Sequence, residues 1–511
     1  MKVKTKLKIA LFVIGLFIQC GIPVASAQLK LPSIFTDNMV LQRNKPIHIW
    51  GWGKPKETVE VTFNGETKSD VVKYDRSWRI SFDPREADTT GRSLTIRHAG
   101  EQCSLKNVLI GDIWLCLGQS NMEWPLEKEL HYAEEVNKTN QRLFRFYNPT
   151  YAGKNVYNEI FGDSIVRRLN TQSFYQGHWE ASNPKTAKDM SAVGYYFGQA
   201  ILHTTGVPIG LINLAIGGAP LETFISTGSL SESQKYKPKV TDNWLYNDHL
   251  PIWVRERGKQ NLEEAKSVPE DTLGPNHAYK PGFAYEAGVK SLFPLPIKGI
   301  IWYQGESNAQ EEERVKEYAD LQALMVNDYR IGWKDAQLPF YWAQLSSIDT
   351  VNYDAHLWPQ FRNEQRKLLS MITNGGMAVT SDIGAKNDVH PRNKKAVGER
   401  LARWALFKTY NRDTVPSGPL VQKVEFNKGR LMVTFAYGEG LASNDGMEVH
   451  GFSVDGLNPV HAEIQHGKVV IRVQESPKYL YYGWQAWSRG NLVNAAQLPT
   501  STFRMPVTSN Q

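Results

Sequence analysis

Short alternating runs of apolar and polar residues fill the chain from Leu29 to about Asn107. The runs at 46–52, 59–63, 78–82 and 94–98 have the period of strands with one buried face, and Asn64-Gly65 predicts a tight hairpin turn. No helical pattern of useful length occurs here. We therefore expect residues 28–107 to form an N-terminal β-sandwich domain.

The pattern changes between residues 108 and 412. Apolar runs typical of buried parallel strands alternate with helical periodicity. The strands are expected at 108–117, 209–216, 297–303, 339–345 and 377–381, and the helices at 192–204, 311–327, 359–372 and 394–410. Such alternation predicts βαβ units and an α/β domain with a doubly wound parallel sheet.

Two further segments interrupt or follow this domain. Residues 222–285 are rich in Ser, Lys, Pro and Asn, which predicts an insertion into the sheet, placed over its functional edge. The alternating pattern then returns at 429–435 and 468–473. Residues 413–511 are therefore expected to form a C-terminal β domain.

The first 27 residues have the composition of a signal peptide. Met1–Lys8 carries four lysines and no acid, an apolar run follows, and Ala25-Ser26-Ala27 precedes Gln28 as a small-residue cleavage site. The apolar run is too short for a stable membrane span. We expect an exported protein, periplasmic or extracellular, with no membrane span.

Charge and cysteine content exclude several classes of function. The net charge of +7 falls to +3 without the leader, with 55 basic against 52 acidic residues and no dense basic run, so nucleic acid is not an expected partner. After the leader only Cys103 and Cys116 remain; they either form one disulfide or stay as thiols, and alone they build no metal site. Neither a metal nor an organic cofactor is expected, and the oligomeric state is left open.

Residues with catalytic chemistry follow the predicted strands. Ser120, the pair Gly217-Gly218, the loop Gln304-Gly305-Glu306-Ser307-Asn308, and Asp388-Val389-His390 each come just after a strand. Ligands of doubly wound sheets bind at the carboxyl ends of the strands. A serine hydroxyl becomes nucleophilic beside an imidazole, and the oxyanion needs backbone or amide N–H donors. The set predicts a serine hydrolase, with Ser120 and His390 as the catalytic pair.

Each feature has a simpler interpretation when it is taken alone. A serine after a strand is commonly a helix N-cap, Gly-Gly is commonly a turn, and Ser307 lies in a frame similar to that of Ser120. The frame around Ser120 lacks the second glycine of the α/β-hydrolase elbow, and P-loop, dinucleotide-binding and zinc-protease motifs are absent from the sequence. A glycosidase with paired carboxylates stays open, because that pairing is spatial.

The motifs together resemble the sialate O-acetylesterase family of SGNH-type serine esterases. The resemblance is carried by the stretches around Gly118-Gln119-Ser120-Asn121-Met122 and Trp302–Asn308, by Gly217-Gly218, by Asp388–Lys394, and by the segment from Leu31 to Gln42. It implies a flavodoxin-like three-layer hydrolase domain flanked by the β domains. It also implies removal of acetyl groups from hydroxyls of sialic acid or related sugars, without a cofactor.

The same resemblance implies a role for each site residue. Ser120 matches the nucleophile and His390 the base. Gly217, Gly218 and Asn308 match the oxyanion hole, and Gln304, Glu306 and Trp124 are expected to contact the O-acetylated sugar.

The acid of the triad departs from the pattern of SGNH-type enzymes. Such enzymes place it three residues before the histidine, where this sequence has Asn387; Asp388 lies two before. We expect Asp388 to be the acid, with Asp382 or a Ser–His dyad as alternatives. An acetylxylan-type esterase and a non-catalytic carbohydrate-binding protein are the competing hypotheses for the whole chain.

Overall fold

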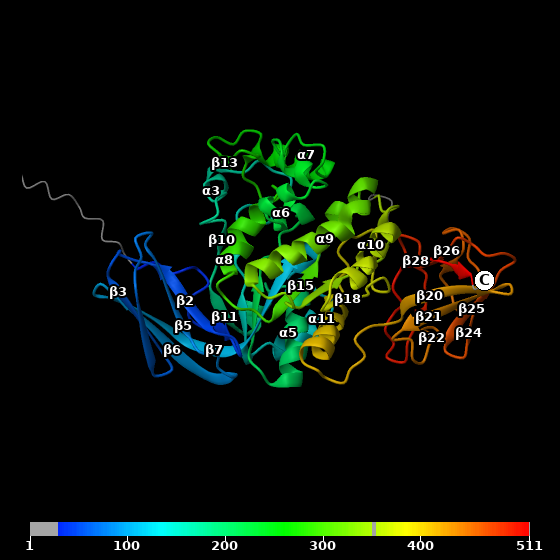
Figure 1. The fold of residues 1–511 in the computed structure, drawn as a ribbon, viewed down its shortest axis with the longest axis horizontal. Helices are drawn as coiled ribbons and strands as arrows, with labels where there is room; N and C mark the ends of the chain where they lie inside the picture. Colours follow the sequence, from blue (N-terminus) through cyan, green and yellow to red (C-terminus); the bar gives the residue numbers. More distant parts are fainter. Residues whose placement is uncertain (1–28, 350–353, 510–511) are drawn as a thin grey trace, which may run out of the picture.

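The computed structural model describes residues 29–349 and 354–509. The predicted leader, residues 1–27, lies outside these ranges. Figure 1 shows three regions in a row: a β region at the N-terminal end, a central α/β region, and a second β region at the C-terminal end.

A seven-stranded path forms the centre of the α/β region. Six strands are parallel, and the edge strand β11 is antiparallel to β8. The order is β11 (Trp179–Ser182), β8 (Gln141–Tyr147), β12 (Ile209–Asn213), β7 (Glu101–Gly118), β15 (Gly299–Tyr303), β16 (Phe340–Ala343) and β18 (Gly375–Ala378). The five expected parallel strands are all present; β8 and β11 were not predicted.

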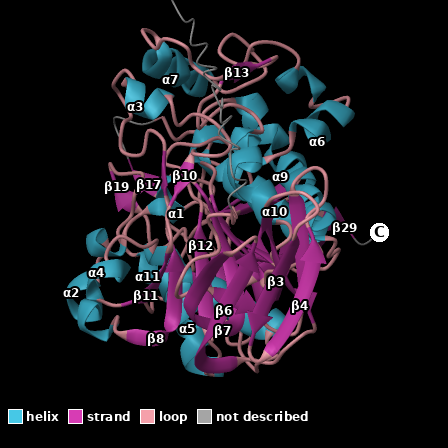
Figure 2. Cartoon of the chain, turned by 90° about the vertical axis from the view of Figure 1, so that its left-hand side faces the viewer, coloured by secondary structure: helices cyan, strands magenta, loops and turns pink. Residues whose placement is uncertain are grey.

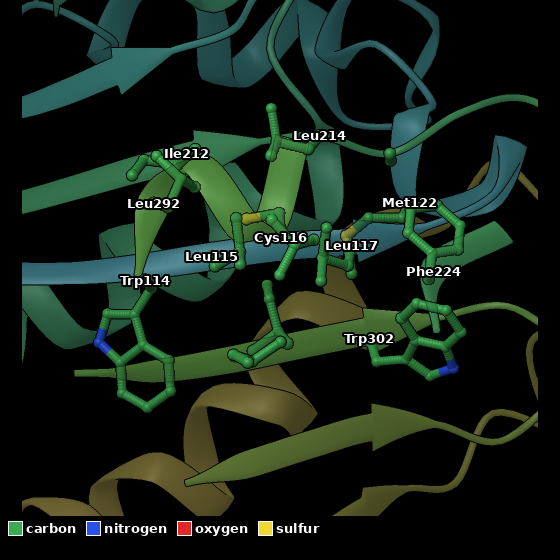
Figure 3. Close-up of a cluster of buried hydrophobic side chains, with 14 of the residues drawn as sticks. Trp114, Leu115, Cys116, Leu117, Met122, Ile212, Leu214, Phe224, Leu292 and Trp302 are labelled. Atoms are coloured by element: carbon green, nitrogen blue, oxygen red, sulfur yellow. The ribbon is translucent and has the colours of Figure 1, made fainter. Parts of the chain in front are cut away.

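Two pairs of helices cover this sheet. α5 (Ala192–Thr205) packs against α11 (Lys394–Trp404), and α9 (Glu312–Trp333) packs against α10 (Trp358–Met371). The first pair lies below the sheet in Figure 1 and the second above it. With both faces covered, β12, β15, β16 and β18 are buried along their whole length, as expected of a parallel sheet. Figure 3 shows side chains of β7 packed among Ile212, Met122 and Trp302.

The N-terminal β region shares its longest strand with the central sheet. β7 begins at Glu101 and pairs there with β6 (Asp88–His98), β3 (Thr58–Phe63) lies next to β6, and β4 (Glu66–Val71) is at the edge; Figure 2 shows these strands in front. β1 (Val40–Gln42) is parallel to β7, while β2 (Ile47–Trp52) and β5 (Ser77–Phe82) form a separate antiparallel pair. β7 therefore runs without a break through the boundary expected at residue 107.

The hairpin turn predicted in this region is present. β3 ends at Phe63, which pairs with Glu66, and the two residues between them, Asn64 and Gly65, have φ angles of 50° and 81°. Two successive positive φ angles are the mark of a type I′ turn, which the Asn-Gly dipeptide favours.

The C-terminal region has its own hydrophobic core. Its main sheet contains β24 (Ala462–Gln465), β25 (Lys468–Arg472), β21 (Arg430–Ala436), β20 (Leu420–Asn427) and β29 (Thr508–Ser509). A second sheet contains β23 (Phe452–Ser453), β26 (Tyr479–Tyr482) and β28 (Phe503–Pro506). Val424, Ile471 and Phe503 belong to a cluster separate from the larger core of residues 34–420.

Cys103 and Cys116 are both free thiols on β7. Thirteen steps along one extended strand separate them by about 40 Å, whereas a disulfide requires Cα atoms within about 7 Å. Of the two states left open by the sequence, the structure therefore shows the reduced one.

Candidate active site

Ser120 is the first residue of the short helix α1 (Ser120–Glu123), which begins directly beyond the carboxyl end of β7. The turn into this helix requires a glycine, because Gly118 has a φ of +136° and a Cβ there would lie 2.1 Å from the Tyr303 carbonyl oxygen. Close packing of β7 on β15 thus fixes where the serine emerges.

His390 reaches the serine from a loop 270 residues further along the chain, just before α11. Its Nε2 lies 2.8 Å from the Ser120 Oγ, which is hydrogen-bond distance for a nucleophile and its base. The neighbouring Asn121 ties the two segments together, since its Nδ2 donates to the Val389 carbonyl oxygen at 2.9 Å. The predicted pair is therefore brought together.

The surroundings of the His390 imidazole favour its neutral form. Burial lowers the pKa of His390 to about 4, with help from the nearby Lys394 and against the opposing effect of Asp388. At neutral pH the ring is therefore free to accept a proton. The Trp124 indole stacks on it, with ring centroids 5.2 Å apart and an angle of 20° between the planes.

Asp388 lies beside the imidazole but does not form a short hydrogen bond with it. Its Oδ1 lies 3.6 Å from the His390 Nδ1, its side chain is 48% exposed, and the same oxygen accepts the backbone N–H of His390 at 2.8 Å. Asp382 makes a two-pronged ion pair with Arg400, at 2.6 and 2.7 Å. Of the two carboxylates considered, Asp388 alone faces the imidazole.

The backbone N–H groups of Ser120, Gly217 and Gly218 are the candidate donors to an oxyanion. Gly218 has a φ of +73°, and a Cβ there would lie 2.4 Å from the Tyr279 Oη. The N–H groups of Gly218 and Ser120 donate to no other residue that the structure describes, whereas the N–H of Gly217 donates to the Tyr151 hydroxyl at 3.1 Å. Of the two glycines, Gly218 has the free donor.

The amide loop after β15 is a buried scaffold. The Nδ2 of Asn308 donates to Glu222 at 3.0 Å, and its Oδ1 accepts from Leu221 and Gln304 at 3.0 and 2.8 Å. Gln304 also accepts from the Tyr318 hydroxyl. In this structure neither Asn308 nor Gln304 lines the pocket described below.

Glu306 and Lys394 sit behind the catalytic pair, where Asn121 bridges them. Asn121 donates to Glu306 and accepts from the Lys394 ammonium. Burial raises the pKa of Glu306 and lowers that of Lys394 to about 7. Glu306 is thus a buried partner of Asn121 rather than a pocket wall, while Trp124 does line the pocket.

A pocket of about 930 Å³ opens over Ser120 and His390. One wall comes from the predicted insertion, through Trp253, Arg257 and Tyr279. The rim carries lysines 128, 154, 185 and 188 as well as the acids Glu127, Glu180 and Asp189, so its charge is mixed. This volume is large enough for a sugar unit. Aromatic walls with scattered polar groups are typical of a small-molecule site.

The sequence did not reveal every polar group of this pocket. Glu123 lines it three residues after Ser120, and Tyr157 and Tyr279 line it as well. An acid one helical turn from the serine was the available signal. In the parts of the chain that the structure describes, no group of three or more His, Cys, Asp or Glu residues is arranged to hold a metal ion. Among those residues there is also no helix with the length and apolarity of a membrane span.

Comparisons with known proteins agree with this geometry. Residues 283–406 match the family model "Carbohydrate esterase, sialic acid-specific acetylesterase". Sialate O-acetylesterases from Pongo abelii and Homo sapiens are each 26% identical over 440 residues, covering 80% of this chain and 76% of theirs. A crystal structure of a carbohydrate acetylesterase from Xanthomonas citri superposes with a TM-score of 0.76 at 29% identity, covering 94% of this chain and 99% of that one. Over most of its length the chain is thus similar to sialate O-acetylesterases, and it is a carboxylic ester hydrolase acting on acetylated sugars.

Proposed function

We propose that this enzyme hydrolyses O-acetyl groups on sialic acid or related sugars through an acyl-serine intermediate. The observation that carries the mechanism is the 2.8 Å contact between the Ser120 Oγ and the His390 Nε2 at the base of a sugar-sized pocket. The sialic acid part of the proposal comes from the family alone, because the mixed charge of the rim favours no particular sugar.

The geometry supports a two-step reaction. The Ser120 oxygen attacks the acetyl carbonyl while the His390 Nε2 takes its proton, and the same nitrogen returns that proton to the leaving sugar hydroxyl. Water, deprotonated by His390, then releases acetate from the serine. The N–H groups of Ser120 and Gly218 are the proposed donors to the oxyanion in both steps, and Asp388 is proposed to orient the imidazole.

The proposal extends to the architecture. Leaving out β11 and β8, the two outermost strands at one end, the central sheet has the order second, first, third, fourth, fifth along the chain. This is the flavodoxin-like order, with Ser120 at the switch point beside β7, and it supports an SGNH-type hydrolase core between two β-sandwich domains. The leader-like sequence at 1–27 supports export; N-terminal sequencing of the mature protein should find Gln28 first.

Acetate release by the wild type and by Ser120→Ala tests the function. We expect release from O-acetylated sialic acid, reduced at least about 10⁴-fold by the substitution at an unchanged melting temperature. Release from acetylated xylan alone would keep the mechanism and overturn the substrate. No release from either ester by folded wild type would refute the esterase mechanism and favour a carbohydrate-binding protein.

A further inference from the structure

One carboxylate of the pocket wall has no part in the ester chemistry proposed above. Glu123 is the last residue of α1, three residues beyond Ser120, and residues at this spacing project from the same side of a helix. Both side chains line the same pocket. The carboxylate is thus fixed, by one turn of helix, close to the nucleophile.

The hydrogen-bonding capacity of Glu123 is only partly used. Its side chain is 8% exposed. Its Oε2 accepts from the Tyr151 hydroxyl at 3.2 Å, whereas its Oε1 faces the Lys154 ammonium at 3.4 Å and accepts no well-aligned hydrogen bond from any residue described. Burial raises the pKa of this carboxyl. This oxygen is enclosed, so the carboxylate acts by holding the Lys154 ammonium at the pocket.

The position of Glu123 relative to the oxyanion loop defines what it would meet. Its Oε2 lies 2.9 Å from where a Cβ on Gly217 would stand, and Gly218 follows with the free N–H. Lys154, whose side chain is 25% exposed, lines the same wall. The pair therefore places an ammonium donor in the pocket, next to a carboxylate that lies close to the Gly217-Gly218 loop.

We propose that Glu123 and Lys154 form the subsite that binds polar groups of the sugar next to the scissile ester. This inference rests on the proposed esterase function and makes it specific. A sugar ester differs from a simple acetyl ester in its neighbouring hydroxyl and amide groups. Glu123 holds the Lys154 ammonium in place, and that ammonium donates a hydrogen bond to a ring, hydroxyl or carbonyl oxygen of the sugar. The pair selects sugar esters over other acetyl esters.

Glu123→Gln keeps the shape of the side chain and removes its charge, so two substrates separate the possible roles. We would measure kcat/KM for an O-acetylated sialic acid and for 4-nitrophenyl acetate, which has no sugar. The ratio of kcat/KM for the O-acetylated sialic acid to kcat/KM for 4-nitrophenyl acetate is expected to fall about 10- to 100-fold, as for the loss of hydrogen bonds to a charged group. Glu134→Gln, which removes the same charge from an exposed residue outside the pocket, is the matched control and should change the ratio less than about twofold.

Each other outcome has a definite meaning. An equal loss on both esters would show that Glu123 acts through Tyr151 on the Gly217 loop, and it would overturn the subsite. An unchanged ratio, or an equal effect of Glu134→Gln, would overturn it as well. Wild type with no Ser120-dependent activity on either ester would refute the esterase function itself. Should Glu123→Gln not fold, judged by its melting temperature, Lys154→Met must lower the ratio instead.

Discussion

Replacement of Asp388 by Asn tests how much the third residue of the triad contributes. Asn keeps a side-chain oxygen that can accept the backbone N–H of His390, the 2.8 Å bond that shapes this loop. The substitution therefore removes the negative charge beside the imidazole while leaving the loop intact. What changes is the stabilisation of the imidazolium that forms as Ser120 loses its proton.

The geometry sets the size of the effect. In a tight triad the loss of the acid costs about 10⁴-fold in kcat, because a short hydrogen bond fixes the tautomer. Here the 3.6 Å between the Asp388 Oδ1 and the His390 Nδ1 exceeds hydrogen-bond length. A screened Coulomb interaction remains, worth about 1 kcal/mol in water and about 4 kcal/mol at an effective dielectric constant of 20. With the carboxylate 48% exposed, the lower half of that range applies, and we expect a 10- to 100-fold loss.

The pH dependence of kcat/KM gives an independent check. The free enzyme needs neutral His390, whose pKa is lowered to about 4 by burial and by Lys394, so activity should fall on the acid side near pH 4. Asp388 raises that pKa, and its loss should move the acid limb to lower pH. A loss of less than about tenfold would refute Asp388 as the acid and favour a Ser–His dyad. A loss of 10⁴-fold, or a limb moved to higher pH, would refute the weak coupling argued here.

Three further substitutions test the packing around the site. Gly218→Ala should lower kcat/KM at least about tenfold, and it should lower the free energy of unfolding, measured by urea titration, by about 1–3 kcal/mol. The reason is that φ is positive at this position and that the added methyl group meets Tyr279. Wild-type values would contradict the role assigned to this loop. The pKa of His277 is lowered to about 3 by burial, so from pH 6.5 down to 3 the unfolded chain binds a proton that the folded chain does not. The free energy of unfolding of the wild-type protein should therefore be about 2 kcal/mol lower at pH 5 than at pH 7, and His277→Gln should remove this contribution to the pH dependence. An equal pH dependence of the two proteins would refute the role of His277. Lys394→Met removes the cation near Glu306 and should lower the free energy of unfolding by about 3–5 kcal/mol. Adding Glu306→Gln should restore part of that free energy, and no recovery would contradict the coupling of the two groups.

The main helices and parallel strands could be predicted because their signals are local. α5, expected at 192–204, spans Ala192–Thr205, and α11 begins at Lys394 as expected, since each carries a long amphipathic pattern between clear boundaries. β8 escaped prediction because Gln141–Tyr147 alternates like an exposed strand and lacks the continuous apolar run of its parallel neighbours. Its place in the sheet depends on β12, which begins more than 60 residues later.

The sequence indicated which residues come together at the candidate site better than it indicated what each of them does there. Ser120 and His390 follow strand ends, and the topology brings strand ends to one edge. Whether an amide faces a pocket or the interior is decided by its partners, and nothing local to Asn308 indicates that Glu222 holds its Nδ2. The same limit hid Glu123, whose position becomes meaningful only when Tyr151 and Lys154 are seen beside it.

The distance between the nucleophile and the base depends on Asn121 more directly than on any strand. Ser120 is fixed by the end of β7, and His390 by a loop that α11 anchors. The bond from Asn121 to the Val389 carbonyl joins these two segments beside the catalytic atoms. Asn121 is itself held on both sides, by Glu306 and by Lys394. Burying two opposite charges costs solvation, which their attraction returns only when the groups are well placed. The amide that bridges them is therefore held in one orientation, and through it the 2.8 Å contact between Ser120 and His390 is held as well.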